Sequence, residues 1–200
     1  MCGRYLIDDE SSSDVWMNYL ENRNASQDVI SSITRGEVFP TNLALAVTKD
    51  GAVAYKWGFP HWKNSSVIIN ARSETALEKN MFRKPLLFDR CVIPSNGFYE
   101  WSRIGGRKKK DKYLLTIFGE RELFMAGMVN EFRAADGNKY NAFVILTTNA
   151  NESVSPIHDR MPVILSSDEQ DLWLEDTSFM EYVLHRPGPE LVSLEFGVRN

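Results

Sequence analysis

Short apolar runs separated by polar turns recur along most of the chain, and this pattern predicts many short β-strands. Residues 43–47 and 53–57 predict two strands that are joined by a turn at Lys49-Asp50-Gly51. A second turn, at Ala135-Asp136-Gly137-Asn138, separates two longer apolar runs. The same reasoning predicts further strands over residues 67–69, 91–94, 98–101, 113–118, 123–129, 142–148, 162–165 and 191–194.

Helical periodicity appears in fewer places. Over residues 12–24, Trp16, Tyr19 and Leu20 follow a Ser/Asp-rich start at helical spacing. Ser167 and Gln170 fit a capping box for a helix that runs through Leu174. Short helices are also predicted over residues 74–82 and 178–184.

These elements predict one α+β domain over residues 1–200, with a mainly antiparallel sheet that can close like a barrel and helices around it. The chain has no internal repeat and no linker that would divide it into two domains. Its 200 residues, 43% of them hydrophobic, suffice for one substantial core. We expect a monomer.

Composition narrows the function classes. Cys2 and Cys91 are the two cysteines, which favours a reducing compartment, and with no export signal or membrane span we expect a cytoplasmic protein. Cys and His are too sparse for a zinc site, so no metal or cofactor is expected. The net charge of −4 (23 basic and 27 acidic residues) argues against a wholesale basic binder of nucleic acid, although a local basic patch suffices for binding. The basic run over residues 103–112 is interpreted as a solvated hairpin tip.

Cys2 follows the initiator methionine in Met1-Cys2-Gly3-Arg4. Removal of Met1 would give a terminal cysteine, whose α-amine and thiol lie on adjacent carbons. Such a 1,2-aminothiol condenses with an aldehyde to an imine, and the thiol then closes a five-membered thiazolidine ring. With reference pKa values of about 7.7–8.0 for the amine and about 8.5 for the thiol, both groups are expected to be partly nucleophilic near neutral pH. The alternative is an ordinary frayed terminus.

Three polar residues stand where an ordinary core would not place them. Asn70 follows the apolar run 67–69, Glu100 lies between two aromatic residues, and His158 precedes a predicted strand. A carboxylate against aromatic walls and an imidazole both suit proton transfer. Taken singly, each has a simple structural explanation: a turn cap, a solvent-facing carboxylate and a loop histidine. Their functional value depends on whether they meet around one point.

Four separated motifs carry a resemblance to a known family. They are Met1-Cys2-Gly3-Arg4, Asn70-Ala71-Arg72-Ser73-Glu74, the run from Cys91 to Trp101, and His158-Asp159-Arg160-Met161-Pro162. Together they resemble the signatures of the SRAP family (SOS response-associated peptidase). Weaker similarities are Trp57-Gly58-Phe59-Pro60 and Ala126-Gly127-Met128, and the motifs follow the family order over residues 1–165. One departure is Phe39-Pro40-Thr41, where family members often have Ala-Pro-Thr.

The resemblance implies a barrel-like core with flanking helices and covalent capture of abasic sites in single-stranded DNA. It implies that Cys2 is the nucleophile and that Asn70 positions the N-terminus and the opened sugar. Glu100 and His158 would move protons during imine formation, ring closure and sugar opening. The same imine can undergo β-elimination, which would give lyase activity, and the peptidase label implies autocatalytic removal of Met1. Aminopeptidase trimming is the competing explanation for that removal.

A second set of residues is expected to contact DNA. Guanidinium groups suit bidentate contacts with phosphate, and Trp62 could stack on a base. The alternatives are pairing of the arginines with Asp159, Glu74 or similar carboxylates, and core packing for the tryptophan. The predicted DNA-contact residues are Arg4, Trp62, Arg72, Arg83 and Arg160.

Two other functions stay open from sequence. The chain could be an N-terminal-nucleophile thiol peptidase built from Cys2, His158 and Glu100, which would turn over peptides and form no stable DNA adduct. It could also be a non-covalent binder of single-stranded or modified DNA, in which case a change at Cys2 would alter nothing.

Overall fold

The computed structural model describes residues 2–8, 14–61, 63–102 and 111–196. Trp62 and most of the predicted hairpin tip lie outside these residues. The helices are α1 (Asp14–Asn22), α2 (Gln27–Ser32), α3 (Asn80–Phe88), α4 (Gln170–Glu175) and α5 (Thr177–His185), with a 3₁₀ helix η2 (Ser73–Thr75). The strands are β1 (Tyr5–Ile7), β2 (Gly36–Val38), β3 (Leu43–Thr48), β4 (Gly51–Trp57), β5 (Phe59–Pro60), β6 (Val67–Ile68), β7 (Asn70–Arg72), β8 (Arg90–Ser95), β9 (Gly97–Ser102), β10 (Asp111–Thr116), β11 (Leu123–Arg133), β12 (Lys139–Asn149), β13 (Arg160–Pro162), β14 (Ile164–Leu165) and β15 (Val192–Phe196).

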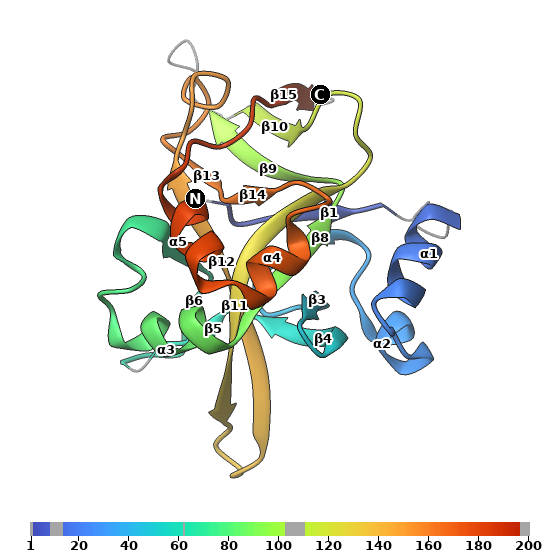
Figure 1. Cartoon of the computed structure of the whole chain (residues 1–200), viewed down its shortest axis with the longest axis vertical. Coiled ribbons are helices and arrows are strands. Elements are labelled where there is room, and N and C mark those ends of the chain that lie inside the picture. The colour runs from blue at the N-terminus through green and yellow to red at the C-terminus, as the bar shows by residue number, and fades with distance from the viewer. Residues whose placement is uncertain (1, 9–13, 62, 103–110, 197–200) are drawn as a thin grey trace.

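Five strands close into a ring. β12 pairs with both β4 and β11, and the path from β4 to β11 runs through β3 and β8. Most pairings are antiparallel, and β12 pairs in parallel with β4 and β7. β11 and β12 extend beyond the ring as a long hairpin, which projects at the bottom of Figure 1. The predicted α+β fold with a mainly antiparallel, barrel-like core is confirmed.

A second sheet, in the order β15-β10-β9-β1-β2, carries the N-terminal segment. Tyr5 lies opposite Phe98 of β9 on one side and opposite Val38 of β2 on the other. Strands of three residues, such as β1 and β2, are too short to show a periodic pattern, and they were not predicted. β1 fixes the direction in which the chain enters the protein from Cys2.

The alternation of side chains along the strands separates two apolar cores. On β3, Leu45 and Val47 face one core, whereas Ala44 and Ala46 face the other. The first core also receives the buried side chains of α3, α4 and α5. The second core contains Cys2, together with the residues that β1 and β9 bury.

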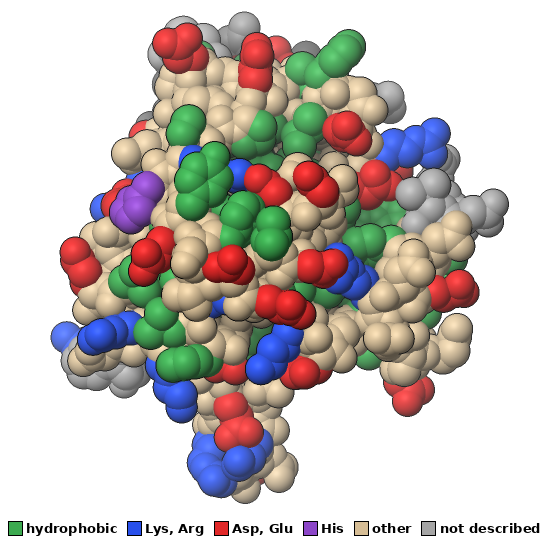
Figure 2. All heavy atoms as spheres, in the orientation of Figure 1, with side chains coloured by type: hydrophobic (Ala, Val, Ile, Leu, Met, Phe, Trp, Pro, Cys, Tyr) green, Lys and Arg blue, Asp and Glu red, His purple; other side chains and the backbone are tan. Residues whose placement is uncertain are grey.

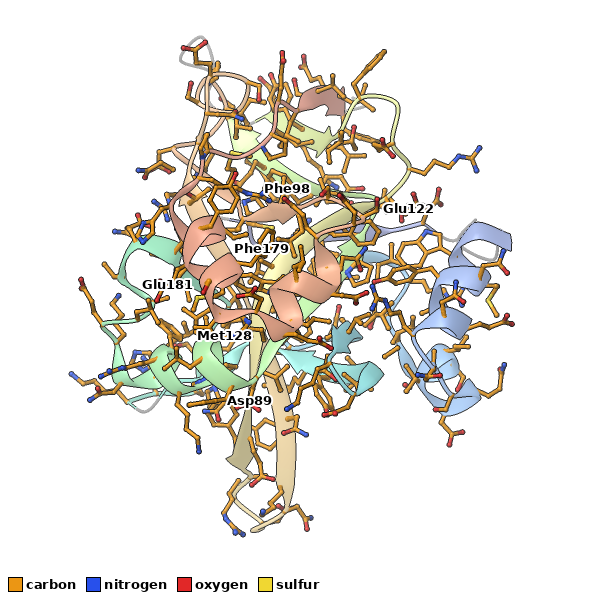
Figure 3. The ribbon with its side chains drawn as sticks, viewed as in Figure 1. Asp89, Phe98, Glu122, Met128, Phe179 and Glu181 are labelled. Atoms are coloured by element: carbon orange, nitrogen blue, oxygen red, sulfur yellow. The ribbon has the colours of Figure 1, made fainter. Side chains whose placement is uncertain are left out.

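The helices cover one face of the strands. In Figure 1, α4 and α5 lie in front of the sheets, α1 and α2 stand to one side, and α3 lies below them. Trp173 of α4 is fully buried, and its indole nitrogen donates to the carbonyl oxygen of Cys91 at 2.9 Å. Figure 3 shows Met128 of β11 behind this helical layer and Glu181 of α5 at its surface. None of the described helices combines the length and apolar character that a bilayer crossing requires.

Two local predictions were wrong. The helix predicted over 74–82 is instead η2 followed by α3, and α3 continues through Pro85, a residue that normally ends a helix. Burial of Phe82, Pro85 and Leu86 on one face compensates for the hydrogen bond that the proline cannot donate. The predicted capping box is also absent from the described contacts, because Gln170 donates its side-chain amide to the carbonyl of Ser167 instead.

Candidate functional site

The N-terminal segment is anchored inside the protein. Cys2 is fully buried, and its carbonyl oxygen accepts a hydrogen bond of 2.9 Å from Nδ2 of Asn70. Two residues further on, the carbonyl oxygen of Arg4 accepts from the backbone N–H of Tyr99 at 2.8 Å. Asn70 starts β7, whose parallel pairing with the interior of β12 gives it a rigid base. The predicted frayed alternative for Cys2 therefore does not apply.

The charge of Glu100 acts on the thiol of Cys2. It belongs to β9, where the register that pairs Tyr5 with Phe98 carries Glu100 back to the level of the segment before β1. Its side chain is buried, with 4% of the residue exposed. The solvent-facing alternative for this carboxylate is excluded.

The surroundings of Cys2 shift the pKa of its thiol away from the reference value. Burial raises the pKa of Cys2 well above its ordinary value, and the charge of Glu100 raises that pKa further. A hydrogen bond from the Arg4 backbone lowers it by less. In the chain that still carries Met1, this environment therefore opposes the partly ionised thiol that the reference pKa predicts near neutral pH.

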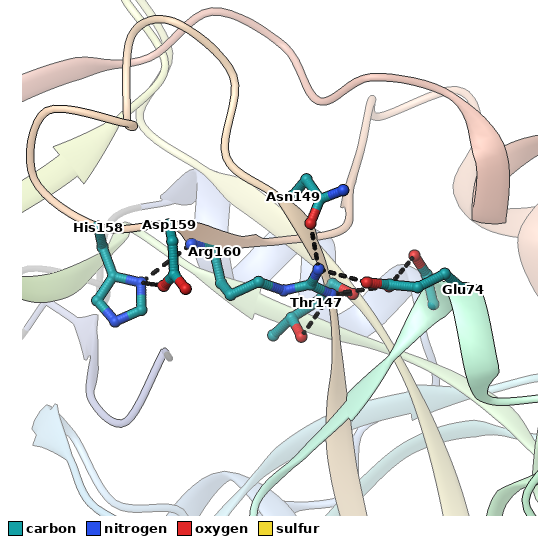
Figure 4. Close-up of polar contacts among 7 residues, drawn as sticks. Glu74, Thr147, Asn149, His158, Asp159 and Arg160 are labelled. Atoms are coloured by element: carbon teal, nitrogen blue, oxygen red, sulfur yellow. Dashed lines mark hydrogen bonds and ion pairs between the residues drawn. The ribbon is translucent and has the colours of Figure 1, made fainter.

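His158 lies on the half-buried loop that precedes β13. Its Nδ1 accepts the backbone N–H of Arg160 at 3.0 Å and also lies 2.8 Å from Oδ1 of Asp159 (Figure 4). These contacts suit different protonation states, because Nδ1 accepts from Arg160 only when it carries no proton and donates to Asp159 only when it does. Ser102 donates to the carbonyl of Pro156 at 3.4 Å, which ties this loop to the end of β9 near Glu100.

Two of the predicted DNA-contact arginines have partners within the protein. Arg4 donates to Glu37 at 3.1 Å, and its guanidinium lies 4.1 Å above the centre of the Phe39 ring. The Phe39 that departs from the family pattern thus supports this arginine. Arg160 is buried and donates to both carboxylate oxygens of Glu74. The intramolecular alternative is correct for both arginines in this structure, and their phosphate contacts stay predictions.

The other two arginines of this set, Arg72 on β7 and Arg83 on α3, are exposed. Trp62 lies outside the described residues. Trp57 and Cys91 are fully buried core residues.

Sequence reasoning did not identify Tyr5 as a buried neighbour of the candidate site. Its ring is fully buried 5.1 Å from that of Trp57, and its hydroxyl has no hydrogen-bond partner among the described residues. Oδ1 of Asn70 is likewise buried without such a partner. Nothing in the spacing of the sequence marks either atom, because both depend on the tertiary surroundings of Cys2.

A cavity of about 680 Å³ lies elsewhere, between α1, β14 and the segment after α5. Trp16, Phe124 and Arg186 help to line it, and none of the candidate residues does.

Within the described part of the chain, no group of three or more His, Cys, Asp or Glu side chains is arranged to hold a metal ion. On the face that carries α4 and α5, Asp and Glu side chains are widely scattered, and Lys and Arg side chains lie among them and at the tip of the β11–β12 hairpin (Figure 2).

Comparisons with known proteins find relatives of this chain in both sequence and fold. The abasic site processing protein YoqW of Bacillus subtilis is 34% identical over 189 residues, which are 87% of this chain and 80% of that protein. The abasic site processing protein HMCES of Gallus gallus is 34% identical over 149 residues, 60% of this chain and 44% of that protein. A crystal structure from Bacteroides thetaiotaomicron has the same fold, with a TM-score of 0.83 over 98% of this chain and 93% of that chain at 23% identity. The model of the SOS response associated peptidase (SRAP) family matches residues 1–191, and the chain therefore belongs to this family.

Proposed function

We propose that this protein processes abasic sites in single-stranded DNA by capturing the opened sugar covalently at Cys2. Its family membership and the relatives named abasic site processing proteins support this function. The observation that carries the proposal is the placement of Cys2, which is buried, hydrogen-bonded to Asn70 and within electrostatic reach of Glu100. An internal cysteine or a flexible terminus would need none of these contacts.

The first step is attack by the amine. Removal of Met1 converts the Cys2 amide nitrogen into an α-amine, which attacks the C1′ aldehyde of the ring-opened sugar. Glu100 relays the two protons that the nitrogen loses to the former aldehyde oxygen: the first makes it the hydroxyl of a carbinolamine and the second releases that hydroxyl as water, giving an imine. His158 assists ring opening by donating a proton to the ring oxygen. Both side chains suit general acid–base catalysis, which typically contributes about 10²–10⁴-fold to a rate.

The sulfur acts second. The raised pKa keeps the Cys2 thiol protonated until the imine has formed. The sulfur then bonds to the imine carbon while the thiol proton passes to the imine nitrogen, so the thiazolidine closes without an external acid or base. Because amine and thiol belong to one residue, the ring closure is intramolecular, which removes much of the entropic barrier.

Asn70 positions both partners. Its Nδ2 holds the Cys2 carbonyl, and its buried Oδ1 can accept a hydrogen bond from the released amine or from a sugar hydroxyl. The exposed Arg72 and Arg83 are proposed to contact DNA phosphates.

Two further activities are considered for the same site. β-Elimination from the imine gives a slow strand-cleaving side reaction. The family description includes peptidase activity, and removal of Met1 is the reaction that would match it. A thiol peptidase, however, needs an ionised sulfur. The burial of Cys2 opposes ionisation of its thiol.

Incubation with single-stranded DNA that carries one abasic site tests the proposal. We expect an adduct that survives a denaturing gel and whose mass is that of the Met1-free protein plus the DNA minus one water. Cys2→Ala should abolish the adduct while non-covalent binding persists, and Cys2→Ser should leave at most a labile species. The matched control is Cys91→Ala, which should still react. An adduct that survives Cys2→Ala would refute the mechanism.

A further inference from the structure

Three segments of the chain meet at the guanidinium of Arg160. Arg160 begins β13, and Figure 4 shows its side chain extending toward Glu74, with contacts to β12 on the way. Nη2 donates to Oε2 of Glu74 at 2.8 Å while Nη1 donates to Oε1. The same guanidinium also donates to Oδ1 of Asn149 at 2.6 Å and to the carbonyl of Thr147 at 2.7 Å.

The segments joined in this way carry the residues of the proposed chemistry. Glu74 lies on η2, directly after the strand that starts with Asn70. His158 lies two residues before Arg160, whose own backbone N–H donates to Nδ1 of His158 at 3.0 Å. The Glu74–Arg160 pair therefore lies between the segment that holds the Cys2 carbonyl and the loop that presents the imidazole.

The pair is well suited to hold these segments at a fixed distance. A planar guanidinium and a carboxylate form two parallel charge-assisted hydrogen bonds, which fix both separation and orientation. The hydrogen bond from Arg160 lowers the pKa of Glu74 to about 2, so the carboxylate stays ionised at any pH used for DNA binding. The Arg160 side chain is 7% exposed and that of Glu74 is 42% exposed.

We infer that Glu74 and Arg160 are positioning residues that set the distance between Asn70 and His158 for the reaction at Cys2. The inference rests on the proposed function. For Arg160 it is the alternative to the predicted phosphate contact, because Glu74 and β12 already occupy both ends of the guanidinium fork. A phosphate could reach the fork only by displacing Glu74.

Single-turnover crosslinking of Glu74→Gln and Arg160→Lys to abasic single-stranded DNA tests this role. Each variant keeps the approximate size of the side chain and loses the paired fork. At saturating DNA we expect the crosslinking rate to fall at least about tenfold, because small misplacements of reacting groups are costly. The affinity for undamaged single-stranded DNA and its salt dependence should not change. Glu74→Asp, which keeps the charge, should recover part of the rate.

The control is Glu78→Gln, an exposed change a few residues away, which should react like the wild type. All variants are compared below their melting temperatures, so that loss of fold is not read as loss of positioning. An unchanged saturating rate in Glu74→Gln overturns the inference. So does a salt slope that falls by about 0.7 in Arg160→Lys with its saturating rate intact, since that marks one lost phosphate contact. If the wild type itself forms no adduct, the proposed function fails and this inference fails with it.

Discussion

In the proposed mechanism the nitrogen of Cys2 reacts before the sulfur, so the two atoms need different surroundings. Burial raises the pKa of the thiol and makes it a poor nucleophile toward a free aldehyde, whereas in the reaction proposed above the same burial would keep water away from the imine that the sulfur attacks. A protonated thiol also brings its own proton to the imine nitrogen. The environment that would weaken a thiol protease therefore suits a residue whose amine reacts first.

Substitution of Tyr5 tests whether a buried hydroxyl near Cys2 makes a stabilising hydrogen bond. Its buried hydroxyl has no hydrogen-bond partner among the described residues, whereas that of Tyr19 donates to Oε1 of Gln170 at 2.8 Å. Tyr5→Phe should leave the free energy of unfolding unchanged or raise it by up to about 1 kcal/mol, and Tyr19→Phe should lower it by about 0.5–1.5 kcal/mol. Urea denaturation of both variants measures the difference. A larger loss for Tyr5→Phe than for Tyr19→Phe would mean that the Tyr5 hydroxyl has a partner after all.

The ends of α3 and α4 depend on one buried arginine of β8. Arg90 is 4% exposed, and burial lowers its pKa because its charge is desolvated. It compensates by satisfying backbone carbonyls that the two helices leave unpaired at their C-termini. The acceptors are the carbonyl oxygens of Leu86, Leu87, Trp173 and Leu174.

Arg90→Met should therefore destabilise the protein by about 2–4 kcal/mol, because several buried carbonyls lose their donor at once. Chemical denaturation compared with the wild type measures the loss. Arg83→Met on the exposed side of α3 is the matched control and should change stability by no more than about 0.5 kcal/mol. If the two variants are equally stable, water replaces the guanidinium and the capping role is wrong.

The elements that sequence predicted well are those with a strong local pattern. The helix expected over 12–24 is α1, and the long alternating runs are β11 and β12. α3 was misplaced because its position depends on tertiary burial, which overrides the local preference of Pro85. Likewise, β1 exists only because β9 and β2 flank it. Sequence thus predicted the architecture, while the short elements that place Cys2 required the structure.

The candidate site divides in the same way. Motifs identified Cys2, Asn70, Glu100 and His158 by residue type, because the proposed chemistry needs those groups. The partners of the arginines could not be selected from several nearby carboxylates, since the pairs are distant along the chain. Glu37 lies 33 residues from Arg4, and Glu74 lies 86 residues from Arg160. Only folding determines which of these charges is neutralised inside the protein and which stays exposed.

Two such ion pairs predict how the folded protein responds to acid. Hydrogen bonds from Arg160 and Arg186 lower the pKa values of Glu74 and Glu169 to about 2 from an ordinary value of 4.5. The unfolded chain therefore takes up protons before the folded one as the pH falls. The stabilisation from these carboxylates is complete above about pH 4.5 and is lost as the pH approaches about 2.

Melting temperatures measured from pH 6 to pH 2 test this expectation in Glu169→Gln. Glu169 is the better probe, because its side chain is 18% exposed and its Oε2 accepts from Arg186 at 2.6 Å. The variant should be less stable than the wild type at pH 6, and the two curves should converge as the pH falls through the window below 4.5. Glu181→Gln, at an exposed position on α5, should run parallel to the wild type. A constant gap between Glu169→Gln and the wild type at all pH values would show that the pair stabilises the fold through packing and not through its charge.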